Sequence, residues 1–237
     1  MKKLIALILV ILIVPVSAGA ADSPQIGQVF TGVHAPYMIE GGLPSHTDFF
    51  TDADFSQYRL TLLNLWDSNC VNCRIELPFF QRAYEQYHDM GVNIVGVACR
   101  FLGGSYEHGW EIINDFGLTY PQVIIDDGIS AVSSSLFFVP QTYFVDSTGT
   151  VIGFYGGFVG YDLVEDAILR ALALPGDADC DGVLTFADVS SASACAVNAG
   201  SLSRQGFLAA DIDGDGIVGP RDISMICSLL GLECGPK

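Results

Sequence analysis

The fold is decided by the stretch Leu60-Thr61-Leu62-Leu63-Asn64-Leu65-Trp66-Asp67-Ser68-Asn69-Cys70-Val71-Asn72-Cys73. Its first half is an apolar run with the length of a buried strand, and the residues after the cysteines predict a helix at 75–90 that Gly91 ends. The two cysteines therefore lie at a strand-to-helix junction. Because the N-terminus of a helix favours a thiolate, Cys70 is predicted to be a nucleophile. Cys73 lies one turn further and can close a disulfide with it.

Strand-like and helix-like segments alternate along the first two thirds of the chain. Short strands or a hairpin are predicted before residue 60. Behind the cysteines, the pattern predicts strands at 92–99 and 120–125, helices at 107–116 and 161–174, and a hairpin of residues 141–145 and 151–155. Strands that alternate with helices need crossover connections, so we expect an α/β fold with a parallel central sheet and an antiparallel end.

Length and charge limit the classes of protein to consider. The chain has 237 residues, which suits two domains at about 100 to 200 residues each. Lys and Arg number 10 against 27 Asp and Glu, for a formal net charge of −17. Nucleic acid is excluded as a partner because duplex binding needs clustered basic residues. Half of the residues are hydrophobic, so the acidic chain can still fold.

The N-terminus has the pattern of a secretory signal peptide at residues 1–20. Lys2 and Lys3 precede an apolar run at 4–14, and Ala18-Gly19-Ala20 forms a small-residue cleavage site. A retained membrane anchor is the alternative, but the run is shorter than the roughly 20 apolar residues of a spanning helix. We therefore expect a secreted or periplasmic protein with no stable membrane span after cleavage, where its seven cysteines could form disulfides.

Three motifs between residues 25 and 174 resemble the extracytoplasmic thioredoxin-like reductases of the TlpA/ResA type. The motifs are Leu63-Asn64-Leu65-Trp66, Cys70-Val71-Asn72-Cys73-Arg74-Ile75-Glu76-Leu77-Pro78 and Val139-Pro140-Gln141-Thr142-Tyr143-Phe144-Val145-Asp146. The resemblance implies a thioredoxin-like domain at 21–174, with a central mixed sheet flanked by helices. It also implies that the protein exchanges disulfides with partner proteins. No organic cofactor is implied, because the disulfide itself carries the two electrons.

The resemblance assigns roles to four residues. Cys70 would be the attacking thiolate and Cys73 the resolving thiol. Pro140 would follow a cis peptide bond, face the disulfide and leave the backbone of Val139 open to a substrate strand. Glu76 would lie on the Cys73 face of the helix, where its carboxyl group can raise the thiol pKa or relay a proton.

Each assignment has an alternative. The cysteine pair could be structural, Glu76 an ordinary solvated residue and Pro140 a trans residue. Cys99, at the end of a predicted strand, is expected to be an inert apolar residue, with redox activity as the alternative. None of the four histidines has metal-ligand spacing. The sequence Val71-Asn72 lacks the proline that the family often has there, so reductant, oxidant and isomerase stay open.

Two other functions compete with thiol-disulfide exchange. A peroxiredoxin would have Pro-x-x-x-Thr-x-x-Cys, but Leu63 and Asp67 occupy these positions before Cys70. The other alternative is a calcium-dependent binding or scaffold protein whose thioredoxin-like domain is not catalytic.

After Pro175-Gly176 the composition changes and a repeat begins. The segments 177–188 and 211–222 both have the pattern of a twelve-residue calcium loop, with acidic residues at positions 1, 3, 5 and 12 and glycine at position 6. Position 12 is Asp instead of the usual Glu. The predicted ligands of two structural calcium ions are Asp177, Asp179, Asp181, Val183, Thr185 and Asp188 in the first loop, and Asp211, Asp213, Asp215, Ile217 and Asp222 in the second.

This duplicated segment resembles a dockerin, a small all-α module with paired F-hands, here at 175–237. The resemblance implies a cohesin-like partner on another protein, contacted around Phe186-Ala187 and Pro220-Arg221; the alternative is a calcium-stabilised tail without a partner. Disulfides are a second expected source of stability for so small a module. The sequence does not choose among the three ways to pair Cys180, Cys195, Cys227 and Cys234.

Overall fold

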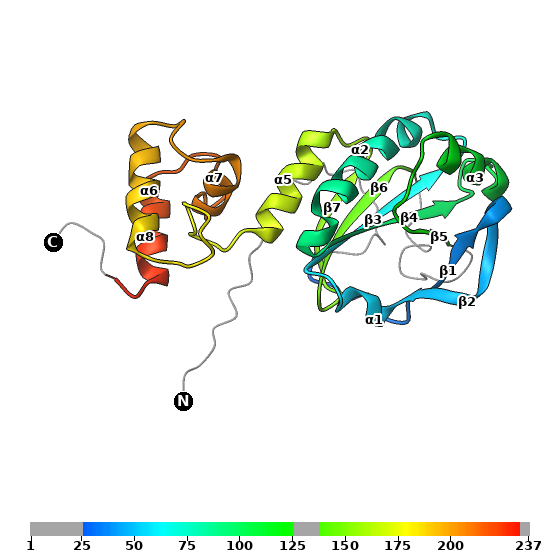
Figure 1. Ribbon diagram of the computed structural model, residues 1–237, viewed down its shortest axis with the longest axis horizontal. Coiled ribbons are helices and arrows are strands. Elements are labelled where there is room, and N and C mark those ends of the chain that lie inside the picture. Colours follow the sequence, from blue (N-terminus) through cyan, green and yellow to red (C-terminus); the bar gives the residue numbers. More distant parts are fainter. Residues whose placement is uncertain (1–25, 126–137, 233–237) are drawn as a thin grey trace. The chain divides into compact units, whose positions relative to one another are not determined.

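The computed structural model describes residues 26–125 and 138–232 (Figure 1). The predicted signal peptide and Cys234 lie outside these residues. The chain divides into two compact units, residues 1–164 and 165–237, and the division falls inside helix α5 (Tyr161–Leu172). The sequence analysis had placed the boundary after residue 174, where it expected the helix to end, whereas α5 ends at Leu172. Among the described residues, no helix is both long and apolar enough to span a bilayer.

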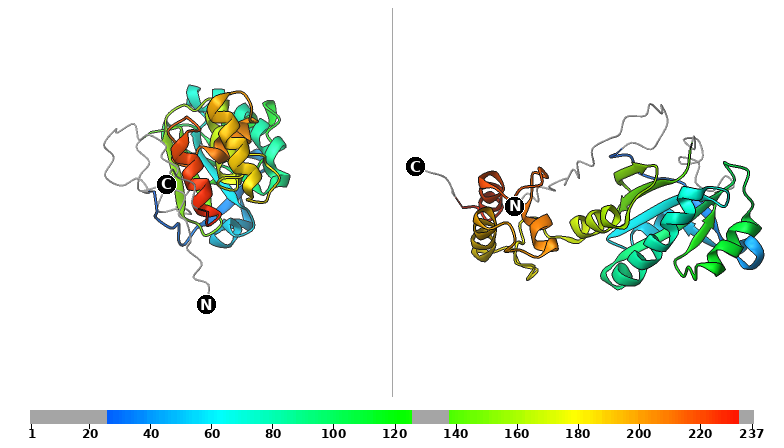
Figure 2. Two further views of the ribbon diagram at one scale, coloured as in Figure 1. Left: turned by 90° about the vertical axis from the view of Figure 1, so that its left-hand side faces the viewer. Right: turned by 90° about the horizontal axis from the view of Figure 1, so that it is seen from above.

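The first unit contains a seven-stranded sheet in the order β2-β1-β5-β4-β3-β6-β7 (Figures 1 and 2). The three strands in the middle of the order, β5, β4 and β3, are parallel, and the pairs at both ends are antiparallel. The sheet is therefore mixed, as expected. The strands are β1 (His34–Ile39), β2 (Leu43–Thr51), β3 (Leu60–Asp67), β4 (Val92–Cys99), β5 (Gln122–Ile124), β6 (Gln141–Asp146) and β7 (Val151–Gly156).

The helices of this unit after residue 60 follow the predicted order, whereas the short helix at 52–55 was not predicted. They are α1 (Asp52–Phe55), α2 (Val71–Tyr87), α3 (Tyr106–Asp115) and α5, with short 3-10 turns η1 (Glu40–Gly42) and η2 (His88–Met90). The predicted start of α2 at residue 75 was wrong. The helix begins at Val71 because Cys70 has an extended backbone and its sulfur caps the first turn by accepting the N–H of Cys73.

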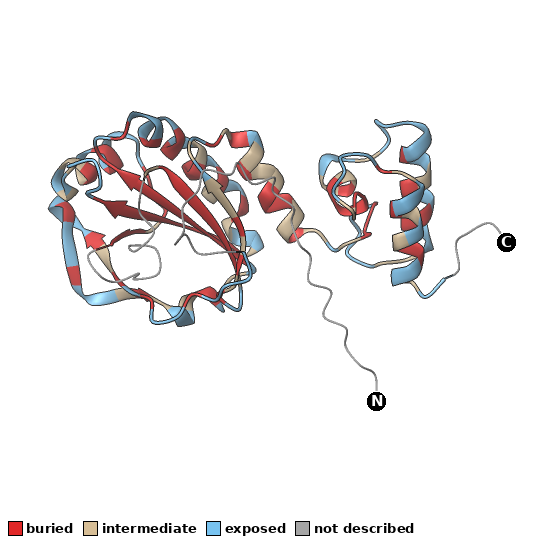
Figure 3. Ribbon diagram, turned by 180° about the vertical axis from the view of Figure 1, so that it is seen from behind, coloured by how far each residue is buried: buried red, intermediate tan, exposed pale blue. Residues whose placement is uncertain are grey.

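Strand β3 is buried at every residue, and so is β4 (Figure 3). Side chains alternate between the two faces of a strand. Leu63 and Leu65 belong to a core with Phe50 and Phe55 on one face. On the other face Asn64 bonds to Glu76 of α2. Burial on both faces explains why the two strands are nearly continuous apolar runs.

The second unit contains three further helices, α6 (Phe186–Val197), α7 (Arg204–Ala210) and α8 (Pro220–Leu229), and no strand within residues 165–232. Its core is formed by buried residues of the helices and of the segments between them: Ala178, Val189, Ala192, Cys195, Ala210, Val218, Ile226 and Cys227. The last acidic residue of each predicted loop caps the next helix. Asp188 accepts the N–H of Thr185 before α6, and Asp222 accepts the N–H of Gly219 before α8.

The cysteines of the second unit do not all pair with one another. Cys180 and Cys195 have free thiols, whereas Cys227 is disulfide-bonded. Each of the three connectivities that the sequence left open uses all four cysteines. None of these complete pairings is therefore formed.

We expect Leu62→Ala to lower the free energy of unfolding of the first unit by about 3 kcal/mol, because it leaves a cavity beside fully buried β3. Both tryptophans, Trp66 and Trp110, lie in this unit, so urea unfolding followed by tryptophan fluorescence reports on it alone. Met90→Ala removes a side chain that is 46% exposed and should change stability by less than about 0.5 kcal/mol. Equal losses in the two variants would contradict the assigned core.

Candidate functional site

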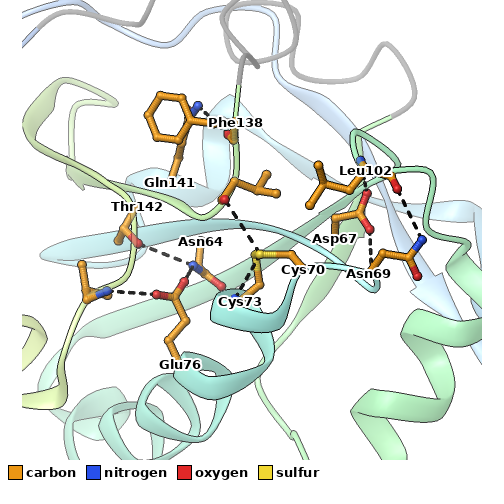
Figure 4. The surroundings of a disulfide bond; sticks show 12 residues. Asn64, Asp67, Asn69, Cys70, Cys73, Glu76, Leu102, Phe138, Gln141 and Thr142 are labelled. Atoms are coloured by element: carbon orange, nitrogen blue, oxygen red, sulfur yellow. Dashed lines mark hydrogen bonds between the residues drawn. A yellow bond between two sulfur atoms is a disulfide. The ribbon is translucent and has the colours of Figure 1, made fainter. Parts of the chain in front are cut away.

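Cys70 and Cys73 form a disulfide at the N-terminus of α2, with their Cα atoms 5.2 Å apart (Figure 4). The Cys70 sulfur accepts the backbone N–H of Cys73 at 3.1 Å. Cys70 is 5% exposed and Cys73 is fully buried. Of the two cysteines, only Cys70 has any solvent exposure, so it is the one that an incoming group would meet first.

The surroundings of Cys70 favour a negative charge on its sulfur after reduction. The unpaired N–H groups and the positive end of α2 lie beneath it. The first turn of the helix contains no acidic residue that would oppose this effect. These conditions lower the pKa of a thiol at the start of a helix.

Val139 and Pro140 lie opposite the disulfide. The peptide bond between them is cis, as the resemblance implied, and the Val139 carbonyl oxygen lies 3.8 Å from the Cys70 sulfur. Figure 4 shows this segment and the start of α2 on either side of the disulfide. The site therefore combines an accessible sulfur with an adjacent backbone carbonyl group.

Glu76 is completely buried behind the disulfide, so the alternative of a solvated residue is wrong. Its carboxyl group accepts a hydrogen bond from the Asn64 side chain at 2.8 Å and another from the Val159 N–H at 3.1 Å. Burial raises the pKa of Glu76 from 4.5 to about 7, although both hydrogen bonds lower it. The group can therefore hold or release a proton near neutral pH.

The sequence analysis did not identify three residues that organise this site. Asn64 holds Glu76, and the carboxylate of Asp67 accepts the backbone N–H groups of Asn69 at 2.8 Å and Leu102 at 2.7 Å. The Asn69 side chain in turn donates to the Leu102 carbonyl oxygen. These bonds fix the turn that carries Cys70 against the loop after β4. Two features of the sequence could have pointed to these residues: the polar Asn64 inside the apolar run 60–66, and the acidic Asp67 directly after it.

Cys99 is separate from this chemistry. It is 2% exposed at the end of β4, and burial raises the pKa of its thiol to about 11. A thiol of this kind stays protonated at neutral pH, in agreement with an inert role. No histidine belongs to a potential metal-binding group within the described ranges.

The predicted calcium loops bring acidic side chains together. Carboxylate oxygens of Asp177, Asp179 and Asp188 lie within 4.8 Å of one another in the first loop, and those of Asp211, Asp213 and Asp215 do so in the second. Desolvation raises the pKa of Asp179, and the carboxylates of Asp188, Asp181 and Asp177 raise it further. Such crowding of carboxylates suits a hard cation with oxygen ligands.

The other predicted ligands are placed differently. Asp181 and Asp222 lie outside the two carboxylate groups: Asp181 accepts the N–H of Val183, and Asp222 accepts those of Ile212 and Gly219. The Thr185 hydroxyl accepts the N–H of Ala187 and caps α6. Val183 and Ile217 have exposed side chains and were expected to contribute only backbone carbonyl groups.

The loops fit calcium in two further respects. Gly182 and Gly216, at position 6, have φ angles of 82° and 84°, a conformation that residues with a side chain rarely adopt. One oxygen of the buried Asp211 carboxylate, Oδ1, has no hydrogen-bond partner among the described residues. A buried oxygen of this kind is costly unless a cation or another donor binds it.

Comparison with known proteins relates the chain to thiol-disulfide oxidoreductases. No family model matches it. The chain is 29% identical to the thiol-disulfide oxidoreductase ResA of Oceanobacillus iheyensis over 104 residues, which cover 44% of this chain and 53% of ResA. The thiol:disulfide interchange protein HelX of Rhodobacter capsulatus is 25% identical over 168 residues, or 70% of this chain and 82% of HelX. The chain spans about half the length of the ResA proteins that it matches.

A solved structure agrees with the fold. A Chlorobium tepidum protein assigned as thiol:disulfide interchange protein DsbE superposes with a TM-score of 0.53 at 18% identity, covering 64% of this chain and all of that one. At this identity the likeness concerns the fold alone. The chain therefore contains a thioredoxin-like α/β fold with a mixed sheet, as predicted, and is similar in sequence to ResA and HelX.

We expect the free energy of unfolding of the oxidised first unit to fall as the pH rises from 5 to 8. Because the folded-state pKa of Glu76, about 7, lies above its ordinary value of 4.5, the protonated group stabilises the fold fully below 4.5 and loses this contribution as the pH passes 7. The loss amounts to about 3 kcal/mol.

Glu76→Gln should remove this part of the pH dependence, measured by urea unfolding with tryptophan fluorescence. Glu85→Gln changes an exposed carboxyl group on the same helix and serves as the control. If wild type and Glu76→Gln have parallel pH profiles, the buried carboxyl group is not the cause.

Proposed function

We propose that the first unit is a thiol-disulfide oxidoreductase that exchanges disulfides with partner proteins through Cys70 and Cys73. The observation that carries this proposal is the disulfide at the start of α2, with one sulfur accessible beside the Val139 carbonyl group and the other buried. Similarity to proteins named as thiol-disulfide oxidoreductases supports it.

The reaction begins with the reduced pair. The Cys70 thiolate attacks one sulfur of a substrate disulfide, which forms a mixed disulfide and releases the other substrate sulfur as a thiolate that takes up a proton. Cys73 then loses its proton and attacks the Cys70 sulfur, which reforms the disulfide seen here and releases the second substrate thiolate. The substrate gains the two electrons that the cysteine pair loses. The same steps in reverse oxidise a substrate dithiol.

Glu76 has a supporting role in this proposal. It lies three residues after Cys73, on the same side of α2, and below the disulfide in Figure 4. Its pKa of about 7 suits a group that accepts the Cys73 proton during the second step and returns it to solvent later. The backbone of Val139 would pair with an extended substrate segment next to Cys70.

We propose that the second unit is a dockerin-like module stabilised by two calcium ions. Support comes from the two groups of carboxylates, the left-handed glycines at position 6 and the unpartnered oxygen of Asp211. Calcium bound to these residues would neutralise the crowded carboxylates and order the loops. The exposed Phe186 and Arg221 side chains would contribute to the surface that contacts a cohesin-like partner.

We also propose an extracytoplasmic location, either secreted or periplasmic. The signal-like sequence of residues 1–20 supports it, as does the pairing of cysteines in both units. The module would then hold the oxidoreductase near its substrates.

Cys70→Ser should abolish reduction of insulin disulfides by the protein in the presence of dithiothreitol, because the attacking sulfur is lost. Cys73→Ser should instead accumulate a mixed disulfide with the substrate, visible by non-reducing electrophoresis and mass spectrometry. Cys99→Ser is the matched control and should keep the wild-type rate, since its thiol is buried and protonated. Full turnover by Cys70→Ser would refute the proposed mechanism.

Calcium should raise the melting temperature of the second unit in differential scanning calorimetry, and EGTA should reverse the change. Asp215→Asn removes an exposed acidic side chain of the second carboxylate group and should reduce the stoichiometry in calorimetric titration from two ions to one. Magnesium at equal concentration is the control, because its small octahedral shell suits such loops poorly. Identical melting curves in calcium and EGTA would exclude a structural calcium site.

A further inference from the structure

The carboxylate at position 1 has different hydrogen-bond partners in the two loops. In the first loop both oxygens of Asp177 accept loop backbone N–H groups, those of Asp181 at 3.1 Å and Gly182 at 3.0 Å. In the second loop Asp211 Oδ2 accepts the N–H of Gly216 at 3.3 Å and Oδ1 has no hydrogen-bond partner. Equivalent residues of a sequence repeat are thus held by different groups.

The additional partner of Asp211 is an arginine from outside the loop. The Arg170 guanidinium, in the last turn of α5, donates to Asp211 Oδ2 at 3.1 Å. The Asp211 side chain is fully buried and that of Arg170 is 25% exposed, so water screens this ion pair only weakly. The recorded ion pairs of Arg204 and Arg221 join Glu165, Asp166 and Asp213, none of which belongs to the first loop. Among the recorded ion pairs of the described residues, the fully buried carboxylate of Asp211 in the second loop is the one that an arginine reaches in this way.

We propose that the positive charge of Arg170 stabilises the second loop when no metal is bound, and that the same charge weakens calcium binding to this loop. This inference rests on the proposed calcium function. Without metal, the guanidinium compensates the buried charge of Asp211 and its neighbours. Calcium on Oδ1 then approaches a positive charge that is already bonded to the other oxygen of the same carboxylate. The first loop therefore fills at a lower calcium concentration than the second.

The expected size of the effect follows from Coulomb repulsion. A single and a double positive charge on either side of one carboxylate repel each other enough to change the affinity by about tenfold even in a water-like dielectric. Arg221 also pairs with a carboxylate of this loop, Asp213, at 3.2 Å. Its side chain is 80% exposed, so solvent screens its charge and its influence should be small.

The test is isothermal titration of the full chain with calcium chloride, comparing wild type with Arg170→Gln. In the variant, the calcium affinity of the weaker site should rise about tenfold, and the affinity of the tighter site should stay the same. The same experiment on Asp215→Asn identifies the weaker site as the second loop. Arg221→Gln should change the affinity less than threefold. Arg204→Gln, which breaks ion pairs of α7 with Glu165 and Asp166 and none with a predicted calcium ligand, should not change the affinity.

Calorimetric melting supplies a second measurement. In EGTA, Arg170→Gln should melt at a lower temperature than wild type, because the buried carboxylate of Asp211 loses its ion pair with Arg170. Saturating calcium should narrow this difference, since calcium then neutralises the same carboxylate. Arg204→Gln should keep the same difference from wild type in both conditions.

Two results would overturn the inference. If Arg170→Gln binds calcium more weakly, Arg170 orients the carboxylate for the ion and does not oppose it. If its affinity equals that of wild type, the ion pair has no effect on the metal. Both results leave the proposed calcium module intact, whereas failure of wild type to bind calcium overturns the module and this inference together.

Discussion

The sulfur of Cys70 is both the N-cap of α2 and the reactive atom of the proposed chemistry. As a cap it accepts the N–H of Cys73, which begins the helix at Val71 and brings the second cysteine within bonding distance of the first. The helix terminus supplies the positive potential that a thiolate needs. This contact sets the position of the disulfide, because the turn that contains Cys70 follows directly after β3 and α2 packs against β3.

Two buried carboxyl groups near this sulfur, those of Asp67 and Glu76, have different hydrogen-bond partners. Asp67 bonds only to backbone N–H groups and fixes the turn, whereas Glu76 is held by one side chain and one N–H in surroundings that raise its pKa. The carboxyl group of Asp67 thus holds the turn in place, and that of Glu76 is suited to proton transfer. Both side chains are fully buried.

The second unit uses acidic residues for two purposes. Asp188 and Asp222 cap helices. Asp188 also belongs to one of the two crowded carboxylate groups, which need a counter-charge. For Asp211 that charge comes from Arg170 in the helix that also closes the first unit's fold. A repeat that is nearly symmetric in sequence is therefore asymmetric in its electrostatics.

The local patterns of the sequence were sufficient to predict the succession of strands and helices from β3 to α5, the mixed sheet, the Cys70–Cys73 pair and the acidic loops. These features depend on interactions between residues close in the chain: hydrophobic periodicity, capping and turn geometry. Strand β4 has the predicted bounds, because seven of the eight residues between Gly91 and Arg100 are apolar or small and Asn93 is the one polar residue.

The bonds of Asn64 to Glu76, of Leu102 to Asp67 and of Arg170 to Asp211 join residues 12, 35 and 41 positions apart, and no local pattern encodes them. The sequence therefore determined which residues can react or carry charge. The tertiary structure alone decided how deeply each is buried and which group faces it, because desolvation and charge pairing depend on packing between distant segments.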